Sequence, residues 1–203
     1  MDPKILGELE IPGFSEFMHP INDDNSMLLT VGQDADEDGR VTGFQISIFN
    51  STVPNDPKLV DRLVIASGDE SFASSSSSWD ERAFRYIQVD GIGRLIIPLN
   101  IYSWSSTSEQ ETFDGFAVFG VDLNRSENVI TREINIDHED SEDGETYGYT
   151  DSRGCYCSPM WLPERSFVFD GNLMTMKRSS VVSTNLVSEE ENWSHSFYGD
   201  CYC

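Results

Sequence analysis

The stretch Pro57-Lys58-Leu59-Val60-Asp61-Arg62-Leu63-Val64-Ile65 places apolar residues near alternate positions, as a half-buried β-strand does. A near-copy lies at the N-terminus, Pro3-Lys4-Ile5-Leu6-Gly7-Glu8-Leu9-Glu10-Ile11, and a looser one runs from Glu127 to Ile136. A strand-like segment that recurs along a chain is typical of repeated architectures. We therefore predict a repeated all-β protein.

The copies end cycles of four strand-like segments joined by turns. Full cycles cover 14–65 and 80–136, and a third covers 155–203, where the pattern stops before a clear fourth strand. Residues 3–11 then read as strand d, the fourth strand, of a preceding unit. Repeated four-stranded antiparallel units are the signature of β-propeller blades. We predict a single propeller module over 1–203 with about three blades; a β-sandwich is the rival, but it needs no repeat of one strand.

Local signals support this division into strands and turns. The dipeptides Asp90-Gly91 and Asp170-Gly171 lie between strand-like segments and predict tight hairpins. No segment has sustained helical periodicity. The run of serines from 74 to 78 has little apolar area to bury, and we expect a solvated, mobile linker there.

The predicted number of blades has a consequence for assembly. Ring propellers usually have four or more blades, so three would leave two unpaired faces. The chain could be the C-terminal part of a longer propeller. Alternatively, two copies could close one six-bladed ring, with the 3–11 strand of each completing the last blade of the other.

The net charge of −23 restricts the class of partner. The chain has 13 lysines and arginines against 36 aspartates and glutamates. Such a surface repels nucleic acid and anionic membranes and attracts cations. No run of apolar residues is long enough to cross a membrane as a helix, so we expect no membrane insertion.

The strongest motif for a metal site is Asp34-x-Asp36-x-Asp38-Gly39. Alternate aspartates supply the hard oxygen ligands that calcium prefers, and a glycine permits the turn that follows. The backbone carbonyl of Arg40 and the hydroxyl of Thr42 would complete the set. Gln45 replaces the bidentate glutamate of an EF-hand, so we predict a calcium loop between propeller strands. The alternative is an acidic Asp-Gly hairpin without metal.

The cysteines form two Cys-x-Cys units, Cys155-Tyr156-Cys157 and Cys201-Tyr202-Cys203, 46 residues apart. Bridging within a unit is geometrically poor, whereas two bridges between the units, parallel or crossed, are easier. Such bridges imply an oxidising compartment. A site for zinc or another soft metal, made by all four thiolates, competes with the bridges. So do reduced thiols and disulfide links between chains.

No catalytic residue can be assigned from the sequence. The three histidines, His19, His138 and His195, are scattered, and no nucleophile elbow, phosphate-binding loop or zinc-protease motif occurs. The four tryptophans lie in or beside predicted loops, where they could bind a glycan or peptide or pack blade edges: Trp79, Trp104, Trp161 and Trp193.

Long runs of the sequence resemble a known family, namely secreted bacterial and archaeal proteins with a C-terminal β-propeller domain. The resembling runs are Ile5 to Pro20, Val31 to Gly43, Ile46 to Asn50, Asp80 to Phe84, Phe113 to Phe116 and Arg165 to Leu173. The resemblance implies a propeller fold and an extracellular, cell-surface or periplasmic location, and it implies no reaction. The chain is similar in extent to only the last three blades.

We therefore expect a calcium-stabilised, disulfide-linked β-propeller module that binds or assembles outside the cytoplasm without catalysis. One alternative is a propeller-based enzyme, either a hydrolase or a metal-dependent oxidoreductase, that works from the central face. A self-assembling structural subunit is a second alternative. Fold alone does not choose among them.

Overall fold

The protein is all-β, as predicted. The structure is a computed structural model, and it describes residues 4–68, 70–104, 112–138, 149–150, 153–159 and 162–203. Its strands form separate antiparallel sheets, and the helical elements among the described residues are two short 3-10 turns. None of the described helices is long and apolar enough to cross a membrane.

The first sheet is a four-stranded meander in the order β1-β2-β3-β4. On β3, Phe44, Ile46 and Ile48 alternate along the strand and are fully buried, as the sequence pattern indicated. Each strand pairs with its neighbour in sequence, so the connections are simple hairpins. The strands are β1 Phe14–Pro20, β2 Met27–Ala35, β3 Val41–Asn50 and β4 Lys58–Ile65.

The central sheet has the strand order β5-β7-β8-β9, with β6 also paired to the long strand β7. The hairpin between β6 and β7 turns at Asp90 and Gly91, which both have positive φ, as we predicted for this dipeptide. Every residue of β8 is buried, because this strand is covered on both faces. The elements are β5 Ser71–Ser74, η1 Ser76–Ser78, η2 Glu81–Ala83, β6 Arg85–Val89, β7 Ile92–Ser103, β8 Phe113–Val121 and β9 Ile130–Asp137.

The third large sheet, which has four strands and which we call the terminal sheet, corrects one expectation. The third cycle does have a fourth strand: β15 pairs along β14, with Val182 opposite Ser194. The sequence pattern missed it because β15 is an exposed edge strand without apolar alternation. The strands are β12 Leu162–Phe169, β13 Asn172–Arg178, β14 Ser180–Asn185 and β15 Glu191–Ser196.

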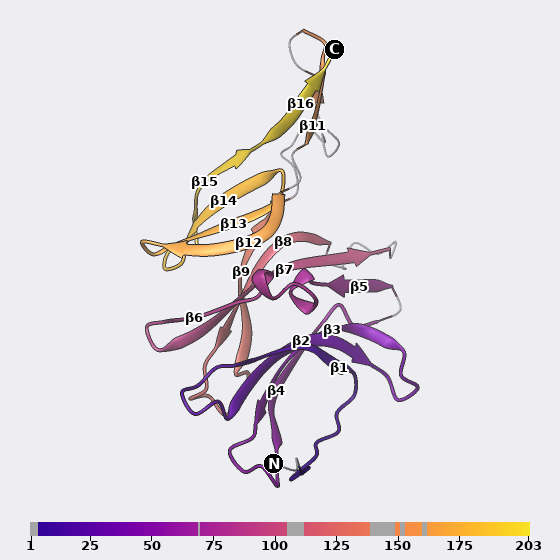
Figure 1. Ribbon diagram of the computed structural model, residues 1–203, viewed down its shortest axis with the longest axis vertical. Coiled ribbons are helices and arrows are strands. Elements are labelled where there is room, and N and C mark those ends of the chain that lie inside the picture. The colour runs from indigo at the N-terminus through magenta and orange to yellow at the C-terminus, as the bar shows by residue number, and fades with distance from the viewer. Residues whose placement is uncertain (1–3, 69, 105–111, 139–148, 151–152, 160–161) are drawn as a thin grey trace.

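A small sheet is formed by segments that flank the terminal sheet in the sequence. Its order is β10-β11-β16, and β16 brings the end of the chain back beside β11. In Figure 1 this hairpin-like pair extends from one end of the molecule. The strands are β10 Tyr149–Thr150, β11 Tyr156–Pro159 and β16 Tyr198–Tyr202.

The three large sheets are stacked face to face along the long axis of the molecule (Figure 1). One apolar cluster joins the first and central sheets, with Val31 and Ile46 packed in the same core as Ile97 and Phe119. A second, smaller cluster joins the central and terminal sheets through residues such as Phe116 and Leu173. The central sheet therefore supplies apolar side chains on both of its faces.

The N-terminal segment corrects a second expectation. Residues 4–11 belong to no strand, although the sequence predicted one over 3–11. A β-strand needs a hydrogen-bonded neighbour, and none of the described strands of this chain pairs with this segment. Ile5 and Leu6 are largely exposed as a result. The gap that this segment was expected to fill in a second copy is already occupied by β15.

The serine run is also different from its expectation. Instead of forming a solvated linker, Ser74 ends β5 and Ser76–Ser78 form η1, and Ser75 and Ser77 are fully buried. Their hydroxyls lie 2.7 Å apart, and the Ser75 hydroxyl accepts a hydrogen bond from the Ser77 backbone N–H. Hydrogen bonding inside the turn offsets the cost of burying these polar groups.

Candidate functional site

The residues of the predicted calcium loop lie on the hairpin between β2 and β3. Asp34 lies near the end of β2, and its carboxylate forms an ion pair with Arg62 of β4. The other oxygen, Oδ2, accepts a hydrogen bond of 2.6 Å from the Thr42 hydroxyl. Asp34 and Thr42, which the prediction assigned to one site, are therefore in contact.

Asp36, the next predicted ligand, holds the turn itself. Oδ1 of Asp36 accepts hydrogen bonds from the backbone N–H groups of Asp38, at 3.0 Å, and Arg40, at 2.8 Å. The carbonyl of Arg40 accepts a bond of 3.0 Å from the Asp36 N–H. Gly39 has a φ of 78°, so it occupies the left-handed region where glycine is favoured.

In this acidic hairpin the carboxylates of Asp34 and Asp36 are already bonded to groups of the protein itself. A cation bound through Asp34 Oδ1 would have to displace the Arg62 guanidinium, and one bound through Asp36 Oδ1 would share that oxygen with two backbone donors. Across the described residues, no three histidine, cysteine or acidic side chains are grouped so as to hold a metal ion. Calcium at this loop stays a prediction.

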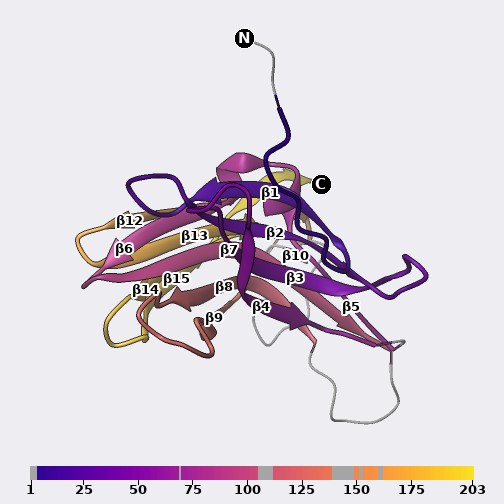
Figure 2. The same cartoon turned by 90° about the horizontal axis from the view of Figure 1, so that it is seen from below.

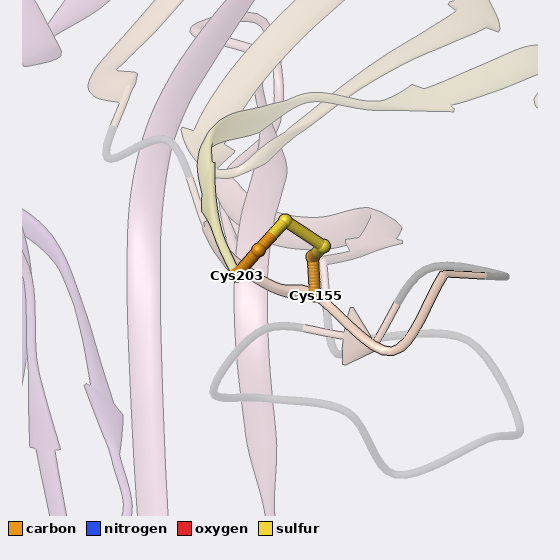
Figure 3. The surroundings of a disulfide bond; sticks show 2 residues. All are labelled: Cys155 and Cys203. Carbon is orange, nitrogen blue, oxygen red and sulfur yellow. A yellow bond between two sulfur atoms is a disulfide. The ribbon is translucent and has the colours of Figure 1, made fainter.

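The cysteine units come together in the small sheet. Cys155 and Cys203 form a disulfide, with their Cα atoms 4.3 Å apart and a sequence separation of 48 (Figure 3). This bond belongs to the crossed alternative, in which Cys155 would pair with Cys203 and Cys157 with Cys201. The backbones of Cys157 and Cys201 are directly opposite in the pairing of β11 with β16, but their side chains lie outside the described part of the structure.

A buried polar network that the sequence did not indicate lies between the central and terminal sheets. His138 directly follows β9 and is 2% exposed. Its Nδ1 is 2.6 Å from the Ser180 hydroxyl and its Nε2 is 2.8 Å from the Thr175 hydroxyl, so both ring nitrogens are satisfied by the terminal sheet. Its backbone N–H donates to the Asp114 carbonyl at 3.0 Å.

Lys177 is the charged centre of this network. Its Nζ contacts Asp114 Oδ1 at 2.8 Å, Glu164 Oε1 at 2.9 Å and Asn100 Oδ1 at 3.0 Å. The other Asp114 oxygen is ion-paired with Arg178. Three oxygen partners match the three N–H bonds of an ammonium group, which allows this lysine to be buried with its charge.

The electrostatics of the network keep His138 neutral. Burial, followed by repulsion from Lys177, lowers the pKa of His138 to about 4, and attraction to Asp114 opposes this shift. Although a serine, a histidine and an aspartate meet here, the Asp114 carboxylate binds Lys177 and Arg178 instead of the imidazole. The geometry is that of an interface between sheets and not of a hydrolytic triad.

The other predicted residues are spread over the molecule. His19 on β1 is near the rings of Phe84, at 5.5 Å, and Tyr86, at 6.2 Å. His195 lies on the exposed strand β15. Trp79, Trp104 and Trp193 are exposed, and Trp161 lies outside the described residues.

Sequence comparison identifies the repeat. The model of the beta propeller domain family matches residues 1–188, which is most of the chain. The chain belongs to the beta propeller domain family. Its four-stranded antiparallel sheets agree with this assignment.

A second comparison finds a relative that is similar to part of this propeller chain. Over 61 residues, 30% of the chain, the chain is 44% identical to uncharacterized protein MJ1554 of Methanocaldococcus jannaschii. The matched stretch spans only 9% of the length of that relative. No solved structure matches the chain significantly.

Proposed function

We propose that the first, central and terminal sheets are three consecutive propeller blades, and that the module works by binding and assembly outside the cytoplasm, without catalysis. The observation that carries the proposal is that both ends of the stack present apolar side chains that the described part of the chain leaves exposed. The two internal interfaces of the stack are built from the same kind of apolar face.

The outer face of the terminal sheet is one of these ends. Phe167, Met174, Ser183 and Trp193 are directly opposite one another across β12, β13, β14 and β15, so their side chains share a face. Phe167 is 42% exposed and Trp193 is 47% exposed. Ser183 between them is buried, so the exposed aromatic side chains lie on the two outer strands of this face. Exposed large apolar side chains on a sheet face are typical of a surface that packs against another protein surface.

The outer face of the first sheet is the other end. A hollow of about 620 Å³ lies between this face and the N-terminal segment. Its apolar walls include Leu9, Met18, Leu28 and Phe49, and Met18 is 55% exposed. The occupant that matches both ends is further propeller blades, supplied by a second copy of the chain or by a longer chain of which this is a part. The relative is a much longer protein, because the 61 matched residues are only 9% of its length, and this supports the longer chain.

The proposal is tested by light scattering together with binding of the dye ANS to exposed apolar surface. Ring closure between copies gives the mass of a dimer with low ANS fluorescence. A part of a longer propeller gives a monomer that binds ANS, and Trp193→Glu with Phe167→Glu reduces that binding, whereas Val187→Glu in an exposed turn does not. A monomer that binds no ANS overturns the proposal.

A calcium ion at the β2–β3 loop is a separate part of this proposal, supported by the oxygen-rich sequence of the loop and the general acidity of the chain. The test compares melting temperatures in calcium chloride, magnesium chloride and EDTA. We expect a calcium-specific rise that is lost in Asp36→Asn with Asp38→Asn. Equal melting temperatures in calcium and EDTA would leave the loop as a metal-free hairpin.

The location outside the cytoplasm is supported by the disulfide between Cys155 and Cys203, since such bonds persist in oxidising compartments. The acidic surface agrees with a medium that screens charge. The partner of the assembled propeller would be a protein or a glycan. Fractionation of the native host cells tests the location, and recovery of the protein in the cytosolic fraction with reduced cysteines overturns it.

A further inference from the structure

A concave pocket lies on one side of the molecule, where an edge of each of the three large sheets is exposed. Figure 2 shows β1, β6 and β12 along this side, with β4 and β9 on the opposite side. The pocket has a volume of about 670 Å³. That volume is within the roughly 300–1,000 Å³ typical of sites for small ligands. All three sheets and η2 contribute to its walls, through Phe17, His19, Glu81, Arg82, Phe84, Arg85, Tyr86 and Arg165.

The charge of the pocket is opposite to that of the molecule. Arg82, Arg85 and Arg165 line it, in a chain with only 13 basic residues against 36 acidic ones. Among the lining residues these three arginines face one acid, Glu81, and Asp80 pairs with two of the arginines. A cluster of positive charge in a strongly acidic protein would attract small anions.

The arginines are held so that donors remain for a ligand. Arg85 donates through Nε to the Ser166 carbonyl at 2.7 Å, and its two terminal amino groups have no partner among the described residues. Arg82 is paired with Asp80 at 3.1 Å, but its side chain is 72% exposed. Asp80 also holds Arg165 at 2.8 Å. Guanidinium groups presented in this way suit a carboxylate or another planar anion.

The remaining wall is aromatic. The rings of Phe17 and Phe84 are 4.8 Å apart, and Tyr86 and His19 extend the surface along β6 and β1. Burial raises the pKa of the Tyr86 hydroxyl, which keeps this group neutral. A flat apolar group placed here would stack on the rings while its charged end meets the arginines.

We propose that this pocket binds a small organic anion with a flat apolar part, of the class of the aromatic carboxylates. The pocket is made within one chain, so the inference does not depend on ring closure or on calcium. Neither the proposed assembly nor the proposed metal loop uses its lining residues.

The experiment is isothermal titration of the whole chain with sodium benzoate, acetate or benzyl alcohol as the probe. Benzoate carries both features, acetate lacks the ring, and benzyl alcohol lacks the charge. We expect saturable benzoate binding that is weakened by sodium chloride, and at least about tenfold weaker binding of the other two.

Two variants locate the binding site. Arg82→Met leaves the cap of η2 intact, because that cap uses the backbone N–H of Arg82. It should weaken benzoate binding by about tenfold. Arg125→Met is the matched control, since Arg125 is also an exposed arginine paired with a nearby aspartate, at 3.2 Å, but lies away from the pocket.

Arg85→Lys keeps a charge but loses the planar fork, and we expect it to weaken benzoate more than acetate. Unchanged circular dichroism and melting temperature show that each variant is folded; Arg82→Met alone decides the test if Arg85→Lys does not fold. No saturable benzoate binding, equal affinity for acetate, or equal losses in Arg82→Met and Arg125→Met would overturn the proposal. Binding of benzoate by a monomer shows that the pocket functions whether or not the ring closes.

Discussion

Lys177 Nζ lies 2.8 Å from Asp114 Oδ1, so a charged pair joins β13 of the terminal sheet to β8 of the central sheet. Both side chains are at least nine-tenths buried, with 2% and 9% of their surfaces exposed. A buried charge is tolerated only when its partner is correctly placed. The apolar cluster between these sheets is less selective about geometry, so we expect this network to fix how the sheets are oriented.

Replacement of Lys177 by methionine should destabilise the fold strongly, because Asp114 and Glu164 then lose a partner in a buried site. We expect the free energy of unfolding to fall by about 3 kcal/mol, moderated by the Arg178 contact that remains. Urea unfolding measures it. Lys58→Met is the control, since Lys58 pairs with Asp56 at 3.2 Å on the surface and should cost under about 1 kcal/mol. Similar losses in both variants would contradict a role for the network.

Acidification should weaken the fold through His138. Its pKa is 6.5 in the unfolded chain and about 4 in the folded protein, so between these values the unfolded chain binds more protons. The contribution of His138 is fully present above pH 6.5 and is lost as the pH falls through about 4, a difference of about 3 kcal/mol. The measurement is the free energy of unfolding from pH 7 to pH 4. His138→Gln should flatten this part of the profile, and His195→Gln on the exposed strand β15 should not. A profile unchanged by His138→Gln would exclude the assignment.

Loss of the disulfide should destabilise the C-terminal part of the fold. In the chain-entropy model a closed loop with a sequence separation of 48 contributes about 4 kcal/mol. Cys155→Ser with Cys203→Ser should therefore lower stability and speed proteolysis between β11 and β16. Peptide mapping without reduction provides the direct check. A peptide linking Cys155 to a different cysteine, or stoichiometric zinc in the purified protein, would refute the crossed bridge.

Gly93→Ala should disturb the pocket between the edge strands. A Cβ at this position of β7 would lie 2.1 Å from the Tyr86 hydroxyl oxygen, so the ring on β6 would have to move. We expect a cost of about 1–3 kcal/mol in thermal or urea unfolding. In a double-mutant cycle with Tyr86→Leu, the two losses should not add, because the smaller side chain removes the clash. Additive losses would show that Gly93 is needed for another reason.

Parts of the fold could be predicted because their signals are local. Asp90 and Gly91 adopt the positive φ values that their hairpin requires, and so do Asp170 and Gly171. The alternation of Phe44, Ile46 and Ile48 identified a buried strand face directly. The spacing of the cysteine units favoured a bridge between them, and Cys155–Cys203 is one.

Other parts depended on contacts between distant segments. The partners of His138, Thr175 and Ser180, are 37 and 42 residues away, and nothing near His138 in the sequence marks it as buried. β15 has no apolar alternation, because pairing with β14 and not burial makes it a strand. The pocket of arginines combines residues of three sheets, so no sequence window contains it.

The sequence by itself determined the all-β repeat, its turns and the bridge between its cysteine units, because hydrophobic alternation and turn chemistry act over a few residues. Only the tertiary structure decided that residues 4–11 stay unpaired, that β15 completes the terminal sheet, and that Lys177, Asp114 and His138 meet in a buried network. The physical reason is that strand pairing and burial of charge depend on which distant segment lies alongside, and packing of whole sheets settles that.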